Sequence, residues 1–302
     1  MKIVSLIPSA TEAIAALGLT DDLVGITHSC DYPTGLRARR VTSTSIPADA
    51  PSAAIDRVVK ESVSGGLPLY ALDTQLLEAM DPDLVVTQSV CDVCAVGEGQ
   101  AVAGLEGLSI RPKILSLHPH RLGDVLDDLL RLGEATGIKE RAESLVKELR
   151  GRIARVRARV ERLTPVSVVV LEWIDPPFSA GHWTPEIVEL AGGRELLGRS
   201  GHRSRELTWE EVREADPEVL LLACCGLDAS RTRVDLRQLE SRPGIRDLKA
   251  VRQARVFVAD GGAHFSRPGP RLIESLELLA ETLHPSGEAR AEALSRAYPA
   301  DA

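Results

Sequence analysis

One stretch of the sequence contains the unit from which the fold is built. It reads Val166-Ser-Val-Val-Val-Leu-Glu-Trp-Ile-Asp-Pro-Pro-Phe-Ser-Ala-Gly-His-Trp-Thr-Pro-Glu-Ile-Val-Glu-Leu-Ala-Gly-Gly193. It begins with a β-branched run, which is typical of a strand buried in a parallel sheet. An aromatic loop follows, and Thr184 and Pro185 then predict the N-cap and first residue of a helix. The closing glycines fit the end of that helix. Strand, loop and helix in this order predict one step of an α/β fold.

The same alternation recurs on both sides of this stretch. We expect strands at 3–7, 23–27, 84–88, 114–117, 219–224 and 256–260. Ser9 to Glu12 has the spacing of a capping box and predicts a helix start there. Residues 31–65 are rich in Pro, Ser and Ala, so we expect them to be mostly loop. The alternation predicts the α/β class, with mostly parallel sheets covered by helices.

The longest helical pattern runs from about residue 122 to 163, with Gly133 and Gly137 as its expected divisions. The piece from Lys139 to Leu163 would be about 37 Å long as one helix, which is enough to bridge two lobes. The sequence therefore predicts four parts: an N-terminal α/β lobe at 1–120, a helical linker with the bridging helix at 121–164, a C-terminal α/β lobe at 165–285, and a polar tail at 286–302.

Composition excludes several classes of protein. The net charge of −8 over 302 residues argues against nucleic-acid binding, which needs clustered Lys and Arg. No apolar run reaches the roughly 18 residues of a membrane span. No secretory signal is visible after Met1, so we expect a cytoplasmic protein as written, or a periplasmic one if a leader has been removed. An odd count of five cysteines argues against a disulfide framework.

The residues that follow the predicted strands are unusual. Ligands of open α/β sheets bind beyond the carboxyl ends of the strands. All five cysteines fall there, and so do five of the nine aromatic residues. Loop aromatics beside Gly and Pro indicate contact with a large flat ligand, although each could instead close the end of a core. These aromatics are Tyr32, Trp173, Phe178, Trp183 and Phe265.

Five motifs, in the same order along the chain, resemble the cobalamin-type class III substrate-binding proteins of ABC transporters. They are Ile3-Val-Ser-Leu-Ile-Pro-Ser-Ala-Thr-Glu12, Asp31-Tyr-Pro33, Pro82-Asp-Leu-Val-Val86, Asp175-Pro-Pro-Phe-Ser-Ala-Gly181 and Phe265-Ser-Arg-Pro-Gly-Pro-Arg271. The resemblance covers the chain to about residue 284. It implies two Rossmann-like lobes bridged by one long helix, with a corrinoid held flat in the cleft between them.

The resemblance and the strand-end positions together give one set of candidate ligand-binding residues. His182 is the candidate for an axial imidazole or a stacking contact, and the alternative is an exposed histidine beside a helix. The full set is Ser9, Ala10, Thr11, His28, Tyr32, Trp173, Pro177, Phe178, Ser179, Ala180, His182, Trp183, His264, Phe265 and Arg267.

A second candidate site consists of thiols. Cys91 and Cys94 form one Cys-x-x-Cys pair, and Cys30 and Cys225 follow other strands. Together they could hold zinc or another metal, ligate the cobalt of a corrinoid, or perform redox chemistry. The alternative is that cysteines are buried as small apolar side chains.

The resemblance also implies an ABC transporter permease as partner, docking on an acidic residue of each lobe. The C-terminal position is Ser266, whereas Glu98 is a candidate on the N-terminal lobe. The sequence contains no nucleophile elbow, phosphate loop or zinc-protease motif. The resemblance therefore implies a corrinoid-binding protein, and we expect that it is not an enzyme. The alternatives are a haem or ferric-chelate binding protein, a cytosolic metal or thiol-redox protein, and an enzyme that acts on a corrinoid.

Overall fold

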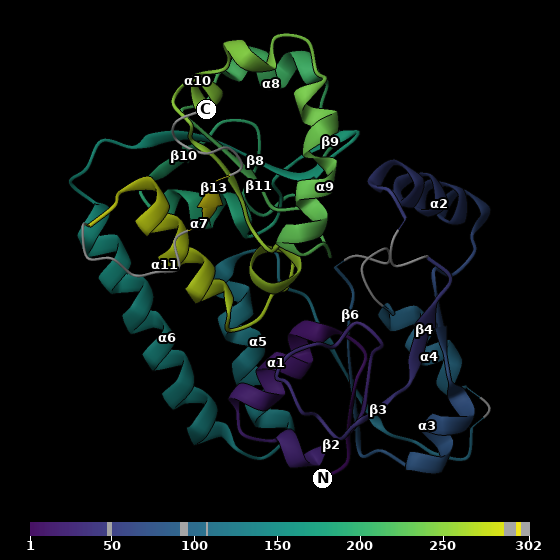
Figure 1. Ribbon diagram of the computed structural model, residues 1–302. Helices are drawn as coiled ribbons and strands as arrows, with labels where there is room; N and C mark the ends of the chain where they lie inside the picture. Colours follow the sequence, from purple (N-terminus) through teal and green to yellow (C-terminus); the bar gives the residue numbers. More distant parts are fainter. Residues whose placement is uncertain (47–49, 91–95, 107, 287–293, 297–302) are drawn as a thin grey trace. The chain divides into compact units, whose positions relative to one another are not determined.

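The computed structural model describes residues 1–46, 50–90, 96–106, 108–286 and 294–296 (Figure 1). The chain forms two compact units. Unit 1 comprises Met1–Pro119 and Gly123–Lys147, and unit 2 comprises His120–Leu122 and Glu148–Ala302. Each unit contains a largely parallel sheet with helices between its strands, which confirms the predicted α/β class.

Unit 1 is built on a five-stranded sheet in the order β3-β2-β1-β6-β7, with every neighbouring pair parallel. The central strands β1 and β6 are buried along their whole length, because helices connect the parallel strands and cover the sheet. A separate antiparallel pair joins β4 and β5. The strands are β1 (Ile3–Ser5), β2 (Leu23–Ile26), β3 (Arg39–Arg40), β4 (Thr42–Thr44), β5 (Tyr70–Leu72), β6 (Leu84–Gln88) and β7 (Lys113–Leu117).

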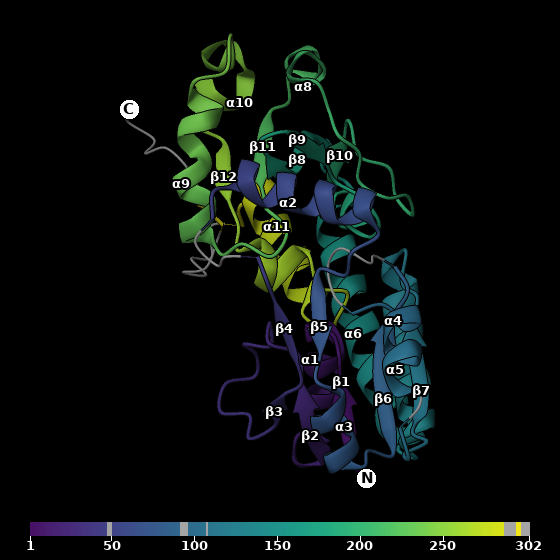
Figure 2. The same ribbon diagram turned by 90° about the vertical axis from the view of Figure 1, so that its right-hand side faces the viewer.

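The helices of unit 1 correct two predictions. The first helix begins at Pro8 with Ile7 as N-cap and no side-chain cap, so Ser9 lies inside its first turn. A proline at this position already presets the helical φ. The expectation of a loop over 31–65 was wrong for its last part, which is a helix. The elements are α1 (Pro8–Ala16), η1 (Thr20–Asp22), α2 (Ser52–Gly65), α3 (Thr74–Met80) and α4 (Glu98–Leu105), with α4 beside β6 (Figure 2).

The long helical pattern forms two helices. Gly133 lies inside α5 (Leu122–Ala135), whereas Gly137, with φ of +76°, lies at the break. Helix α6 (Lys139–Val160) is continuous over 22 residues, as predicted for the bridging helix. The boundary between the units falls within α6, after Lys147. Its bridging role remains a prediction.

Unit 2 has a sheet in the order β10-β8-β11-β12-β13, and β9 pairs with the end of β8. The pairs from β10 to β12 are parallel, so the carboxyl ends of β8, β11 and β12 lie at one edge. Part of the predicted polar tail pairs antiparallel with β12 as β13. The strands are β8 (Val166–Ile174), β9 (Pro177–Ser179), β10 (Gly193–Glu195), β11 (Val219–Leu222), β12 (Val256–Val258) and β13 (Ser295–Arg296).

The helices of unit 2 start largely as their sequences indicate. Thr208 and Glu211 form a capping box at the start of α8. Helix α7 begins at Thr184 with Trp183 as N-cap, one residue earlier than expected. The elements are α7 (Thr184–Leu190), α8 (Trp209–Ala215), α9 (Ala229–Glu240), η2 (Ile245–Asp247), α10 (Lys249–Arg252), η3 (Gly261–Phe265) and α11 (Leu272–Leu283).

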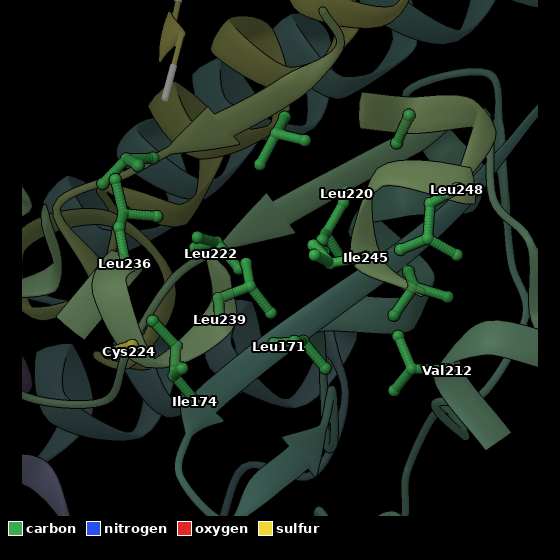
Figure 3. Packing of buried hydrophobic residues seen from close by; sticks show 14 of the residues in the cluster. Leu171, Ile174, Val212, Leu220, Leu222, Cys224, Leu236, Leu239, Ile245 and Leu248 are labelled. Carbon is green, nitrogen blue, oxygen red and sulfur yellow. The ribbon is translucent and has the colours of Figure 1, made fainter. Parts of the chain in front are cut away.

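One face of the unit 2 sheet carries a large apolar core. Side chains of β8 and β11 point toward those of α9 and of the segment that leads into α10 (Figure 3). This burial holds the strand ends, and therefore the loops that follow them, in fixed positions. The residues drawn there include Leu171, Ile174, Val212, Leu220, Leu222, Cys224, Leu236, Leu239, Ile245 and Leu248.

Within the described part of the chain, every helix is too short or too polar to cross a lipid bilayer.

Candidate functional site

In unit 1, the turn from β1 into α1 contacts the loop that follows β2. The Thr11 hydroxyl lies 3.0 Å from the Cys30 sulfur and donates to the Ser5 hydroxyl at 2.9 Å. Ala10 and Thr11 are 0 % exposed, and Ser9 is 4 % exposed. Because these predicted side chains are buried, a ligand could contact this turn chiefly through its backbone.

The loop after β2 also holds His28 and Tyr32. The His28 Nδ1 lies 2.8 Å from the Thr42 hydroxyl, and its ring centre lies 5.6 Å from that of Tyr70. Burial, and then the charge of Arg40, lower the pKa of His28 below its usual range. Tyr32 is 44 % exposed, so it is available to a ligand. Tyr70 was not predicted, because its strand, β5, is not among the expected strands.

In unit 2, three loops meet where β8, β11 and β12 end. The backbone N–H of Cys225 donates to the Glu172 carbonyl at 2.9 Å, which joins the first two loops. An added Cβ on Gly261 would lie 2.7 Å from the carbonyl carbon of Cys224, so the third loop is packed against the second. The predicted convergence of strand-end loops therefore occurs within this unit.

Two aromatic residues fix two of these loops to each other. The Trp183 indole N–H donates to the Phe265 carbonyl at 2.8 Å, and the Phe265 side chain is 1 % exposed. The Ser275 hydroxyl in α11 donates to the His264 carbonyl in the same loop. Phe265 therefore anchors the loop, whereas Trp173 is partly buried and packs against the apolar core.

The other predicted residues of unit 2 divide by exposure. Phe178 and Arg267 are partly exposed and lie in or beside the converging loops, so both remain candidates for ligand contact. Pro177, Ser179 and Ala180 are buried in and just after β9. Their backbone pairs with β8 and the segment before α8, which positions the residues that follow.

The dipeptide Gly181-His182 has a demanding conformation. The Gly181 N–H donates to the Glu172 carboxylate at 3.1 Å. An added Cβ at Gly181 would collide with backbone atoms of residues 202–204, including the His202 oxygen at 2.9 Å. His182 has φ of +50°, in the left-handed region that non-glycine residues seldom adopt.

The ring of His182 lies close to two other rings. Its ring centre is 5.4 Å from that of Trp183 in a stacked arrangement, and 5.7 Å from that of His120. Burial first, and then the charges of His120 and Arg203, lower the pKa of His182 to about 4. The ring is therefore neutral at neutral pH. His120 was not predicted, although it follows a predicted strand by three residues and that position is the only sequence signal for it.

The thiols divide into different environments. Cys224 is fully buried, and burial raises its pKa to about 12, so it does not form a reactive thiolate at neutral pH. Cys30 is buried beside Thr11, and Cys225 is partly buried. Cys91 and Cys94 lie outside the described residues. Within the described ranges, no group of three or more His, Cys, Asp or Glu side chains is placed to hold a metal ion. The four-cysteine site therefore stays a prediction.

Two α/β units with parallel sheets, and loops gathered at the carboxyl ends of the strands, define the class of two-lobed substrate-binding proteins. The family model of the periplasmic binding proteins matches residues 3–262. The chain belongs to this family.

Individual relatives give the same assignment. The chain is 24% identical over 289 residues to a vitamin B12-binding protein of Photorhabdus laumondii, covering 95% of this chain and 89% of the relative. It is 23% identical over 290 residues to the ABC transporter substrate-binding lipoprotein YvrC of Bacillus subtilis, covering 94% and 80%. The periplasmic haem-binding protein RhuT of a Roseiflexus species matches with a TM-score of 0.69 at 24% identity, covering 94% and 97%.

These names describe binding and transport proteins, which supports a non-enzymatic role at the level of the family. They include both vitamin B12 and haem as ligands. They also include a lipoprotein and a periplasmic protein, and so they do not support the expectation of a cytoplasmic location.

Proposed function

We propose that this protein binds a corrinoid, as a substrate-binding protein of the ABC-transporter type or a derivative of one. The observation that carries the proposal is the cluster of loops in unit 2, where Trp183, His182 and Phe265 meet at one sheet edge. The partly exposed His182 ring, stacked on Trp183, offers a flat face and a neutral imidazole to a large planar ligand.

The chemistry of a corrinoid fits the side chains that the candidate residues offer. A corrin ring needs apolar or aromatic contacts on its faces, and its amide side chains need hydrogen-bonding partners around the rim. Phe178 and Tyr32 supply aromatic surface, and Arg267 supplies donors. The relatives named for vitamin B12 support this ligand.

Haem is the second candidate, because the chain carries side chains of two kinds that can ligate its iron. Tyr32 is exposed and carries a phenol oxygen, and His182 carries a neutral imidazole. Solved structures of haem-binding proteins share the fold. Iron accepts both tyrosinate and imidazole ligands, whereas a cobalamin needs neither to bind.

The test is a titration of metal-analysed protein with cyano-, aquo- and adenosylcobalamin and with haemin, followed by calorimetry and visible absorption. One-to-one cobalamin binding, weakened in Trp183→Phe and unchanged in the control His284→Asn, supports the corrinoid. Binding of haemin alone, with a spectrum that changes in Tyr32→Phe or His182→Asn, would transfer the assignment to haem. Folded protein that binds neither compound would refute the proposal.

A further inference from the structure

His120 and His182 have a separation that suits a shared metal ion. Their ring centres are 5.7 Å apart, with an angle of 37° between the ring planes. Two imidazole nitrogens that each lie about 2 Å from one metal ion place the ring centres roughly 5 to 6 Å apart. His120 precedes α5 and His182 precedes α7, so two loops distant in sequence bring the pair together within unit 2.

The imidazole of His182 has a buried nitrogen that none of the described residues satisfies. Its Nδ1 is buried and accepts or donates no hydrogen bond among the described residues. A buried polar atom without a partner costs free energy, and an ion is one of the ordinary ways in which that cost is recovered.

The backbone around the pair is firmly held. The His182 N–H donates to the His202 carbonyl at 2.6 Å, and the His182 carbonyl accepts from Gly201 at 2.8 Å. On the other loop, the Leu122 N–H donates to the Glu186 carboxylate at 3.0 Å. A site whose supporting residues are fixed in this way does not have to be assembled when the ion arrives.

We propose that His120 and His182 form a two-histidine site for a borderline transition-metal ion such as Zn²⁺, Ni²⁺ or Cu²⁺. Imidazole suits these ions and does not suit Mg²⁺ or Ca²⁺. No third His, Cys, Asp or Glu joins the pair in the part of the chain that the structure describes, so water or a small ligand completes the coordination. Exposed His120 provides the path from solvent.

A purely structural role makes a different prediction. If His182 serves only to pack on Trp183, its loss lowers the stability of unit 2 and leaves metal affinity unchanged. The metal site does not depend on the proposed corrinoid binding, because it concerns a free ion and two residues of unit 2. A titration that shows no cobalamin binding would therefore not bear on the proposed metal site.

The experiment is isothermal calorimetry of the full chain, without an affinity tag, against Zn²⁺, Ni²⁺, Cu²⁺ and Mg²⁺. The variants are His120→Asn and His182→Asn, because asparagine tolerates the left-handed backbone at residue 182 better than alanine does. The matched control is His284→Asn, whose ring bonds the Gly192 carbonyl elsewhere in the unit. Circular dichroism confirms that each variant is folded.

We expect one ion per chain, with Cu²⁺ bound most tightly and Mg²⁺ not bound. Changes to residues that merely support a metal ligand cost about 10- to 100-fold in affinity, so loss of either histidine should cost at least about tenfold. His284→Asn should bind like the original chain. Absence of binding, or binding that survives in both His120→Asn and His182→Asn, would overturn the proposal.

Discussion

The carboxyl group of Glu195 should make unit 2 less stable as the pH rises. Glu195 accepts hydrogen bonds from the backbone N–H groups of Val170, Leu197 and Gly198 at 3.1 to 3.2 Å. Burial raises the pKa of its carboxyl from 4.5 to about 7, against the effect of these donors. These bonds fix the segment that leads to residues 199–204. The backbone of His182 is hydrogen-bonded to Gly201 and His202 in that segment.

The sign follows from the direction of the shift. Because the pKa of Glu195 is higher in the folded state than in the unfolded chain, the folded state retains the proton over an interval in which the unfolded chain loses it. The associated stability is complete below a pH of about 4.5 and is lost as the pH rises through about 7. A carboxyl pKa raised from 4.5 to about 7 corresponds to a loss of at most about 3 kcal/mol, and the partial exposure of the residue reduces that figure.

The assay is urea denaturation at several values from about pH 5 to about pH 8, comparing the original chain with Glu195→Gln. All three tryptophans, Trp173, Trp183 and Trp209, belong to unit 2, so their fluorescence reports the unfolding of that unit. The lowered pKa of His182 makes the free energy of unfolding rise with pH below about 6.5, which is the opposite sign. Both proteins contain His182, so this contribution cancels when their free energies of unfolding are subtracted.

The variant should be less stable at pH 5, because its amide NH₂ faces at least one backbone N–H and leaves it without an acceptor, at a cost of about 1–3 kcal/mol. That deficit should shrink or reverse by pH 8, since the amide does not ionise. A difference in the free energy of unfolding that stays constant from pH 5 to pH 8 would refute the reasoning.

Three further substitutions test the packing that supports the loops, each measured by urea denaturation of unit 2. Gly181→Ala should cost about 1–3 kcal/mol, because its Cβ would meet backbone rather than a movable side chain, and an unchanged midpoint would contradict this. Thr208→Ala should cost about 1 kcal/mol through loss of the cap on α8, whereas Thr208→Ser should keep the cap and most of its stabilisation. Leu222→Ala, at 0 % exposure, should cost about 2–5 kcal/mol, and a cost below 1 kcal/mol would show that the core collapses around the cavity.

The strands of both units were predictable because their signal is local. A run such as Val166–Leu171 is β-branched and apolar throughout, and such a run is stable only where both faces of a sheet are covered. The structure extends this strand to Ile174, since pairing with β9 continues it beyond the apolar run. That pairing depends on a turn and on a partner strand, neither of which the run itself encodes.

Helix α2 shows the opposite case. Its residues include Ile55, Val58 and Val59 at helical spacing, yet the surrounding Pro, Ser and Ala content led to the prediction of a loop. The composition of the whole segment 31–65 hid the helical periodicity of the 14 residues that form α2. Periodicity is the better guide here, because it reports which side chains share a face.

The candidate site was predictable only in part. Strand-end position was enough to select His182 and Trp183, because parallel strands deliver their loops to one edge. It could not select His120 as the neighbour of His182, since the loop before α5 reaches that place through the fold of the chain. Nor could it show that Phe265 is buried and contributes its carbonyl rather than its ring.

The conformation of His182 is the strongest reason to assign it a ligand rather than a packing role. At φ of +50°, glycine or asparagine would be accommodated at lower cost. A histidine at this position adds a second cost, because its Nδ1 is buried without a hydrogen bond among the described residues. Stacking on Trp183 recovers part of these costs, but any planar side chain could provide that. What imidazole alone adds is a neutral nitrogen that coordinates metals, and a bound ion would recover the remainder.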